Sequence, residues 1–138
     1  MDQRKTALIV GMAKSGIGAA KLLCRNGYRV IINDQKAQID GLEEALAGYS
    51  VENRLGEEPS SLLTGVDLLV PSPIIPMSTP FIAQAQEAGV EVVSEIELGY
   101  RYARADFVCI TGTNGKTTCT ALTGELFKAG GFHTVGLG

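Results

Sequence analysis

A lysine and several threonines accompany two glycines in the stretch Thr111-Gly112-Thr113-Asn114-Gly115-Lys116-Thr117-Thr118. Glycines allow backbone conformations in which successive N–H groups point into one concavity that binds phosphate. The Lys116 ammonium offers a full positive charge to the β- and γ-phosphates of a nucleotide, and the Thr117 hydroxyl can coordinate Mg²⁺. We therefore predict that residues 112–118 bind a nucleotide, with Lys116 and Thr117 in the catalytic roles.

The residues around this loop place it between a strand and a helix. An apolar run, 106–110, predicts a strand, and Lys116 begins a helical pattern that continues to Ala129. This order directs unpaired N–H groups and the positive end of the helix dipole toward an anion. The general P-loop pattern requires a glycine at position 110, where this chain has Ile110. The alternative interpretation is a glycine turn with a surface lysine.

Composition and charge exclude several classes of protein. Of the 138 residues, 45% are hydrophobic and 20% are charged, which is typical of a globular protein. A net charge of −3 argues against nucleic-acid or membrane-surface partners. No stretch is long enough to span a bilayer. The cysteines, Cys24, Cys109 and Cys119, lack metal-ligand spacing and favour a reducing cytoplasmic setting, with Cys24 and Cys109 as packing residues.

Strand and helix patterns alternate through the first two thirds of the chain. We predict strands at 6–10, 29–33, 51–55, 67–70 and 90–93, with helices around 19–24, 39–47, 58–63 and 79–88. This pattern predicts an α/β fold with a Rossmann-like, doubly wound parallel sheet in a domain of residues 1–94. Residues 95–138 then form a linker helix to about Arg104, capped by Ser94 with Glu97 as its capping-box partner, and the first βα unit of an incomplete P-loop domain.

A first glycine loop, Gly11 to Gly16, follows the first strand. With Asp34 roughly 20 residues further on, it resembles a dinucleotide-binding fingerprint. Ala13, however, occupies the position of the second glycine, and Lys14 is unusual in such a loop. An NAD-binding dehydrogenase is thus one alternative, although it leaves the second loop unexplained. A nucleotide-sensing module without catalytic activity is another.

The second loop, T-G-T-N-G-K-T-T, resembles the signature of the Mur ligase and folylpolyglutamate synthetase superfamily, whose members form amide bonds at the expense of ATP. Across the whole chain, the order of five motifs is similar to the D-glutamate-adding Mur ligases. These motifs are Gly11 to Gly16, Asp34-Gln35-Lys36, Ser72-Pro73-Ile74-Ile75-Pro76, Ser94 to Leu98 and Thr111 to Thr118.

The resemblance implies an ADP-forming ligase of cytoplasmic peptidoglycan precursor synthesis. Its substrates would be UDP-N-acetylmuramoyl-L-alanine and D-glutamate, its cofactors ATP and Mg²⁺, and its route an acyl phosphate. It implies that Lys14 and Ser15 meet the UDP diphosphate, that Asp34, Gln35 and Lys36 surround the uracil and ribose, and that Ser72, Pro73 and Ile74 close over the other side. By the alternative interpretation, Asp34 and Lys36 are solvated turn residues. We expect a monomer.

Two departures from the family pattern concern the first domain. Ala13 replaces the second glycine of Gly-x-Gly, and Ile74 replaces the glycine of Ser-Pro-Gly-Ile. We expect these 138 residues to be part of a longer protein and to be inactive alone. The single histidine, His133, is expected at the surface, and Glu95 and Glu97 are expected to be helix-start residues and not catalytic acids.

Overall fold

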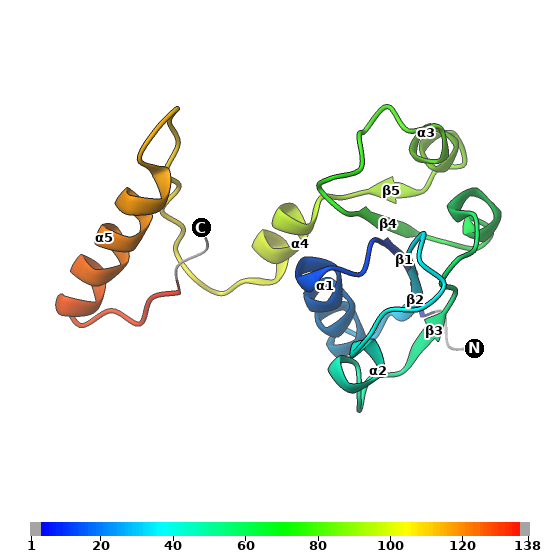
Figure 1. The fold of residues 1–138 in the computed structure, drawn as a ribbon, viewed down its shortest axis with the longest axis horizontal. Helices are drawn as coiled ribbons and strands as arrows, with labels where there is room; N and C mark the ends of the chain where they lie inside the picture. The colour runs from blue at the N-terminus through cyan, green and yellow to red at the C-terminus, as the bar shows by residue number, and fades with distance from the viewer. Residues whose placement is uncertain (1–3, 136–138) are drawn as a thin grey trace. The chain divides into compact units, whose positions relative to one another are not determined.

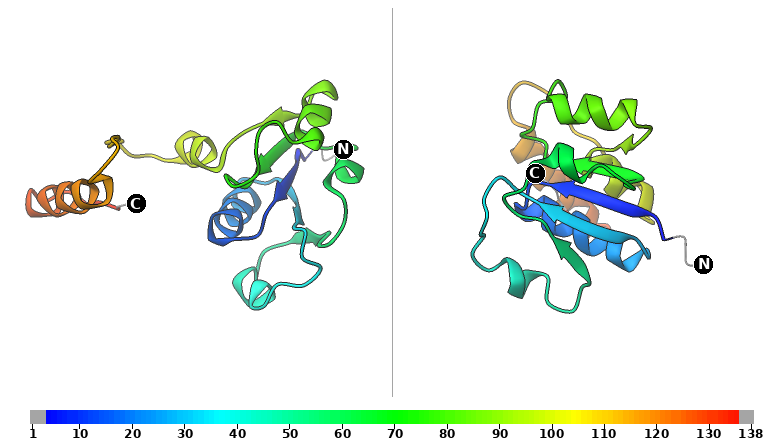
Figure 2. Two further views of the ribbon diagram at one scale, coloured as in Figure 1. Left: turned by 45° about the horizontal axis from the view of Figure 1, so that its top comes forward. Right: turned by 90° about the vertical axis from the view of Figure 1, so that its right-hand side faces the viewer.

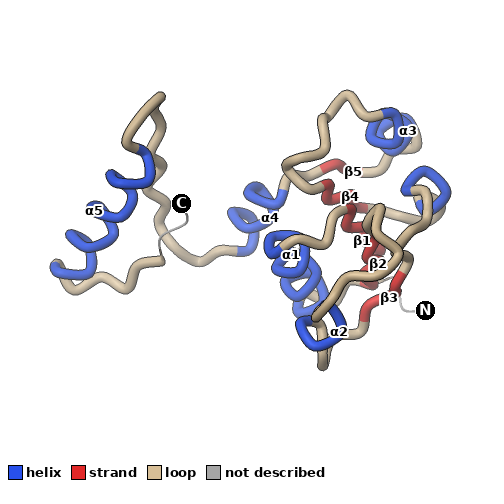
Figure 3. The backbone as a smooth tube through the Cα atoms, viewed as in Figure 1, coloured by secondary structure: helices blue, strands red, loops and turns tan. Residues whose placement is uncertain are grey.

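The computed structural model describes residues 4–135 and divides the chain into two units. The first unit ends at Ala103 and the second begins at Arg104 (Figure 1). Strands and helices alternate along the first unit (Figure 3). They are β1 (Thr6–Val10), α1 (Lys14–Arg25), β2 (Arg29–Asn33), α2 (Leu42–Ala45), β3 (Val51–Asn53), the 3₁₀ helix η1 (Pro59–Leu62), β4 (Leu68–Pro71), α3 (Pro80–Glu87), β5 (Glu91–Val92) and α4 (Glu95–Tyr102).

The five strands form one parallel sheet in the order β3-β2-β1-β4-β5. The central strand β1 is buried along its whole length, as its uninterrupted apolar run predicts. The chain leaves β1 toward β2 and β3, then crosses back to add β4 and β5 on the other side of β1. The predicted α/β fold with a parallel sheet is confirmed.

Helices cover both faces of this sheet (Figure 2). On one face, α1, α2 and α4 pack over side chains such as Ile9 and Ile32. On the other, η1 and α3 pack over Leu8 and Leu69. Each of these four side chains is almost completely buried, and burial of a side chain of this size contributes about 2 kcal/mol to folding. Strand periodicity thus divides the apolar residues between two core layers.

Several elements are shorter than their sequence patterns predict. The helix expected over 39–47 is only the single turn α2, because Gly41 precedes it in a left-handed conformation (φ 74°) and Gly48 follows with φ 83°. The helix expected over 58–63 is the 3₁₀ turn η1. The strand expected over 51–55 ends at Asn53, whose side chain accepts a hydrogen bond from the Leu55 N–H (3.0 Å) and turns the backbone.

The N-cap residues of α3 and α4 are those predicted from the sequence, but some of their hydrogen bonds differ from the prediction. Ser94 caps α4, and its hydroxyl accepts the Glu97 N–H at 3.1 Å. The Glu97 carboxylate pairs with Arg101 (2.7 Å), so the structure supports only the Ser94 half of the predicted capping box. Thr79 stands at the N-cap of α3, but its hydroxyl donates to the Pro76 carbonyl (2.6 Å) and caps no helical N–H.

The second unit contains α5 (Lys116–Ala129), which has the predicted bounds. The strand predicted over 106–110 is wrong for this structure, since those residues adopt no regular structure. A strand is stabilised by hydrogen bonds to a neighbouring strand, and the described part of this unit provides none. Consequently Cys109, expected to pack in a core, is exposed, as are Leu122 and Leu126 on α5. His133 is exposed, as expected.

The first unit buries part of Cys24, as its position on the apolar face of α1 predicts, and this burial raises the pKa of its thiol. Within residues 4–135, none of the helices combines the length and the apolar character that crossing a membrane requires.

An ion-pair cluster joins the β2 and β3 strands and predicts a pH dependence. Glu52 accepts from Arg29 at 2.5 Å and from Arg54 at 2.9 Å, and these hydrogen bonds lower the pKa of Glu52. A lowered pKa in the folded state stabilises the fold above the unfolded value, about pH 4.3, and this stabilisation disappears as the pH falls through the folded value.

We therefore expect Glu52→Gln to lower the free energy of unfolding by about 0.5 kcal/mol at pH 7, because the pairs are partly exposed. Urea unfolding at pH 7 and pH 3 measures this, and the two proteins should converge at pH 3. Glu87→Gln, on α3, is the control and should change little. If the difference in unfolding free energy between wild type and Glu52→Gln were as large at pH 3 as at pH 7, the ion pairs of Glu52 would not be its cause.

Candidate functional site

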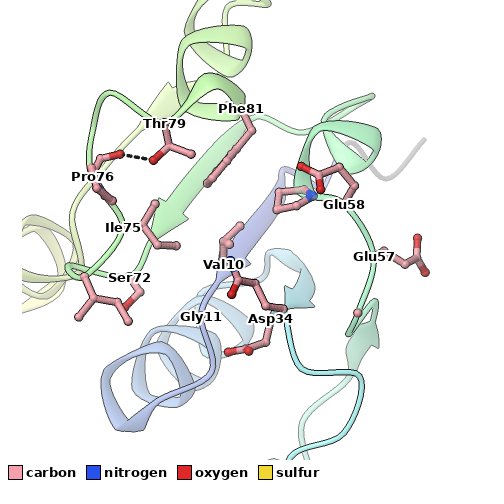
Figure 4. Close-up of a pocket in the computed structure, with 14 residues that line it drawn as sticks. Val10, Gly11, Asp34, Glu57, Glu58, Ser72, Ile75, Pro76, Thr79 and Phe81 are labelled. Atoms are coloured by element: carbon pink, nitrogen blue, oxygen red, sulfur yellow. Dashed lines mark hydrogen bonds between the residues drawn. The ribbon is translucent and has the colours of Figure 1, made fainter.

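A pocket of about 510 Å³ lies at the carboxyl edge of the sheet (Figure 4). One side comes from the end of β1 and the segment after β2, namely Val10, Gly11, Asp34 and Gln35. A second comes from the loop after β4 and the start of α3, namely Ser72, Ile74, Ile75, Pro76, Thr79 and Phe81. A third is formed by residues 56–59 after β3. The pocket therefore opens where the chain reverses its direction of winding, which is where open parallel sheets bind ligands.

Close backbone contacts shape the floor of this pocket. Gly11 has φ 104°, and a Cβ at this position would lie 2.5 Å from the Ser72 Cβ. A Cβ on Gly16 would lie 2.0 Å from the Gly11 carbonyl oxygen. The Gly11 N–H donates to Asn33 O, and the Ser72 N–H donates to Val10 O, each at 2.8 Å. Glycine at 11 and 16 thus lets the first turn of α1 approach the strand ends.

Asp34 connects the first glycine loop to the segment after β2. Its two carboxylate oxygens accept the Met12 N–H at 2.8 Å and the Lys36 N–H at 3.0 Å. In the dinucleotide fingerprint, the corresponding carboxylate binds ribose hydroxyls. Here both oxygens already accept backbone donors, so Asp34 has a structural role besides lining the pocket, and it is not merely a solvated turn residue.

The proline-rich loop after β4 is a compact turn. The Ile75 N–H donates to Ser72 O (2.9 Å) and the Thr79 N–H donates to Pro76 O (3.0 Å). Ile75 packs against the core beneath α3, whereas the Ile74 side chain is 87% exposed at the pocket. In Figure 4, Ser72, Ile75 and Pro76 lie across the pocket from Glu57 and Glu58. Ile74 therefore presents apolar surface to whatever enters the pocket.

Sequence analysis missed the third wall, Gly56, Glu57, Glu58 and Pro59, along with Thr79 and Phe81. A signal was present, because this Gly-Glu-Glu-Pro turn follows a parallel strand and must emerge at the same edge as Asp34. Gly56 has φ 77° and its N–H donates to Asp34 O at 2.8 Å. The lining side chains include three carboxylates and no lysine or arginine. A phosphate therefore fits better outside the pocket than among these residues.

The residues predicted to bind a uridine nucleotide fall into two groups. Asp34, Gln35, Ser72 and Ile74 line the pocket, whereas Lys14, Ser15, Lys36 and Pro73 do not. Lys14 and Ser15 form the first turn of α1, whose N-cap residue, Ala13, makes no side-chain cap. This helix end offers backbone N–H groups and the positive end of the helix dipole beside Gly11.

The second predicted loop forms a glycine turn that leads into α5. Gly112 has φ 155° and Gly115, the N-cap, has φ 76°. Residues 111–118 are all exposed, and the Lys116 ammonium donates to the Gly112 carbonyl at 2.6 Å. Lys116 thus folds back over the turn, and the first turn of α5 has no side-chain cap. These features fit a triphosphate-binding loop, since φ > 0 at Gly115 suits glycine and the helix terminus attracts anions.

A parallel sheet with a pocket at its switch point defines an open α/β domain of the kind that binds ligands at this edge. The family model of the Mur ligase MurD-like N-terminal domain matches residues 5–94. The UDP-N-acetylmuramoylalanine–D-glutamate ligase of Alkaliphilus metalliredigens is 41% identical over 99% of this chain and 31% of its own length. The enzyme of the same name from Geobacter metallireducens is 43% identical over 94% of this chain and 29% of its own length.

Two solved structures share the fold. A pseudomurein peptide ligase type C from Methanothermus fervidus matches with a TM-score of 0.61 and 24% identity, over 93% of this chain and 27% of that chain. A UDP-N-acetylmuramate:L-alanyl-γ-D-glutamyl-meso-diaminopimelate ligase from Neisseria meningitides matches with a TM-score of 0.60 and 17% identity, over 93% and 40%.

The chain belongs to the Mur ligase family, and within it to the MurD-like branch. It spans about 30% of the length of these curated relatives, namely 31% and 29%. The resemblance stated from the sequence motifs is thereby confirmed.

The glycines of α1 provide a test of the close packing under the pocket. Gly16→Ala should lower the free energy of unfolding by about 3 kcal/mol, because its Cβ collides with the Gly11 carbonyl and the backbone must shift. Gly18→Ala is the matched control: a Cβ there would meet no atom within 4 Å beyond its chain neighbours and its own helix backbone, and alanine should stabilise the helix by about 0.5–1 kcal/mol. Urea unfolding of both variants measures the difference. Equal stabilities would show that the contact at Gly16 is unimportant.

Proposed function

We propose that the whole protein is an ATP-dependent, ADP-forming ligase. It adds D-glutamate to UDP-N-acetylmuramoyl-L-alanine in cytoplasmic peptidoglycan precursor synthesis, and so serves cell-wall formation, cell shape and division. The observation that carries this proposal is the switch-point pocket beside the uncapped α1 terminus, in a chain 41% identical to a protein of that name. Residues 1–94 are proposed as the UDP-substrate domain, and residues 95–138 as a linker helix and the start of the ATP-binding domain.

The uridine nucleotide is proposed to occupy both parts of the first site. Its base and ribose enter the pocket, where Asp34, Gln35 and the following Lys36 lie at one side and the loop of Ser72, Pro73 and Ile74 lies at the other. Its diphosphate lies at the α1 terminus, near Lys14 and Ser15, outside the acidic wall. In this arrangement the anionic diphosphate lies away from the three carboxylates. The N–H and hydroxyl groups of uridine can donate hydrogen bonds to acceptors in the pocket.

ATP is proposed to bind at the second loop, through backbone N–H groups and side chains of residues 112–118. Lys116 would exchange its bond to the Gly112 carbonyl for the phosphates, and Thr117 would be a ligand of Mg²⁺. Mg²⁺ supplies charge neutralisation during phosphoryl transfer. The γ-phosphoryl passes to the substrate carboxylate, the D-glutamate amine attacks the resulting acyl phosphate, and phosphate leaves. Residues 106–110 are proposed to become the strand of this βα unit when neighbouring strands are present. Residues 1–138 alone are proposed to be inactive.

Isothermal titration of the protein with UDP, NAD⁺ and Mg-ATP, each separately, tests the first site. We expect UDP to bind and NAD⁺ to give no heat, because Ala13 stands where a dinucleotide loop has its second glycine. Binding of NAD⁺ without UDP would overturn the proposal in favour of a dehydrogenase. Binding of nucleotides by a full-length protein that shows no ligase turnover would instead favour a sensing module.

Replacement of the loop lysine tests the second site in the full-length protein. Lys116→Ala should reduce ligase turnover by about 10³-fold, because the charge on the transferred phosphoryl loses its partner, with little change in thermal unfolding. Lys128→Ala, at the far end of α5, removes the same charge and should leave turnover within a factor of about two. Phosphate release from ATP, measured with both substrates present, compares them. Near-normal turnover of the Lys116 variant would remove this loop from the mechanism.

A further inference from the structure

Asn33, the last residue of β2, is the largest polar residue among the fully buried side chains of the first unit that the structure describes. Only 1% of its surface is exposed, and it does not line the pocket. Strand alternation places it on the same face of the sheet as Ile31, beneath the layer that contains η1. An amide at such a depth is costly unless its polar atoms are bonded.

The amide is bonded to the pocket wall that follows β3. Asn33 Nδ2 donates to the Arg54 carbonyl at 2.7 Å and to the Glu57 carbonyl at 2.9 Å. Both partners are acceptors, so the nitrogen must face them and the orientation of the amide is chemically determined. The other amide atom, Oδ1, is buried and has no hydrogen-bond partner among the described residues. This buried, half-satisfied amide therefore binds two carbonyl groups of the loop after β3.

The main chain of Asn33 also bonds to Gly11, at the floor of the pocket. The Asn33 carbonyl accepts the Gly11 N–H at 2.8 Å. The loop after β3 has two further bonds to this strand end, from the Arg54 N–H to Ile32 O (2.9 Å) and from the Gly56 N–H to Asp34 O (2.8 Å). Neither of these two bonds involves the carbonyl group of Glu57. The Asn33 amide bonds the Glu57 carbonyl to the end of β2.

We propose that Asn33 is a positioning residue: its side-chain amide holds the Gly56–Pro59 wall close to Gly11 at the pocket floor, and so determines ligand affinity without touching the ligand. Glu57, Glu58 and Pro59 line the pocket immediately after this contact. Loss of the two donors frees the wall to move outward, and the pocket widens. The choice of UDP as a probe rests on the proposed function, whereas the positioning of the wall does not.

Two variants and a matched control test this inference in the protein. Asn33→Asp exchanges the NH₂ group for an oxygen that faces two carbonyl oxygens. Asn33→Ala removes both donors without adding charge and serves if the first variant does not fold. Asn53→Asp makes the same exchange at the end of β3, where the side chain accepts from the Leu55 N–H and a carboxylate can do so equally well.

The readouts are the Kd for UDP at a temperature well below the unfolding midpoint, and hydrogen exchange of the peptide that covers residues 54–60. We expect Asn33→Ala to weaken UDP binding by about tenfold or more and to accelerate exchange in this peptide, with Asn53→Asp close to wild type. A merely structural residue would lower the unfolding midpoint and leave both readouts of the folded protein unchanged. That result would overturn the inference.

The two proposals fail in different ways. If wild-type protein does not bind UDP, the proposed function fails and hydrogen exchange alone decides the role of Asn33. Accelerated exchange confined to residues 54–60 would then support the positioning role, and unchanged exchange would overturn it.

Discussion

The site of this protein depends on the approach of three backbone segments at the end of β1. Gly11 lies against Ser72 on one side and the first turn of α1 on the other, at distances that leave no room for a Cβ at positions 11 or 16. Packing at this density fixes the end of the helix relative to the strand ends, since neither can shift without a collision. The same close contacts therefore determine both the orientation of the α1 terminus and the shape of the pocket floor.

Polar contacts then connect the loops to this floor. Asp34 holds the glycine loop and the turn after β2 through backbone N–H groups, and Asn33 holds the loop after β3 through its amide. Two side chains at the end of β2 thus hold the loops around the pocket by bonds to backbone. Such an arrangement keeps loops near a fixed geometry, which lowers the entropic cost of binding a ligand.

The fold of the first unit followed closely from periodicity, because apolar strands, glycine stops and the Thr79-Pro80 start are local signals. The second unit shows the limit of this approach. Its helix was correctly predicted from local signals, whereas the strand over 106–110 needs partner strands that a local pattern cannot supply. For the site, the spacing of the first glycine loop predicted Asp34, and the family resemblance implied Ser72. The position of residues 56–59 after a parallel strand indicated the edge of the sheet at which they lie, but their approach to the pocket depends on tertiary contacts such as those of Asn33, which no local pattern gives.

The outer strands of the sheet, β3 and β5, have only three and two residues. Each carries a glutamate in an ion pair: Glu52 with Arg29 and Arg54, and Glu91 with Arg101 at 2.7 Å. A strand from another molecule could form only a few backbone hydrogen bonds with either edge. It would also have to accommodate these charges. These ion pairs link neighbouring elements of the fold. They also oppose edge-to-edge aggregation, because without them the backbone of both edge strands would be free to pair with strands of another molecule.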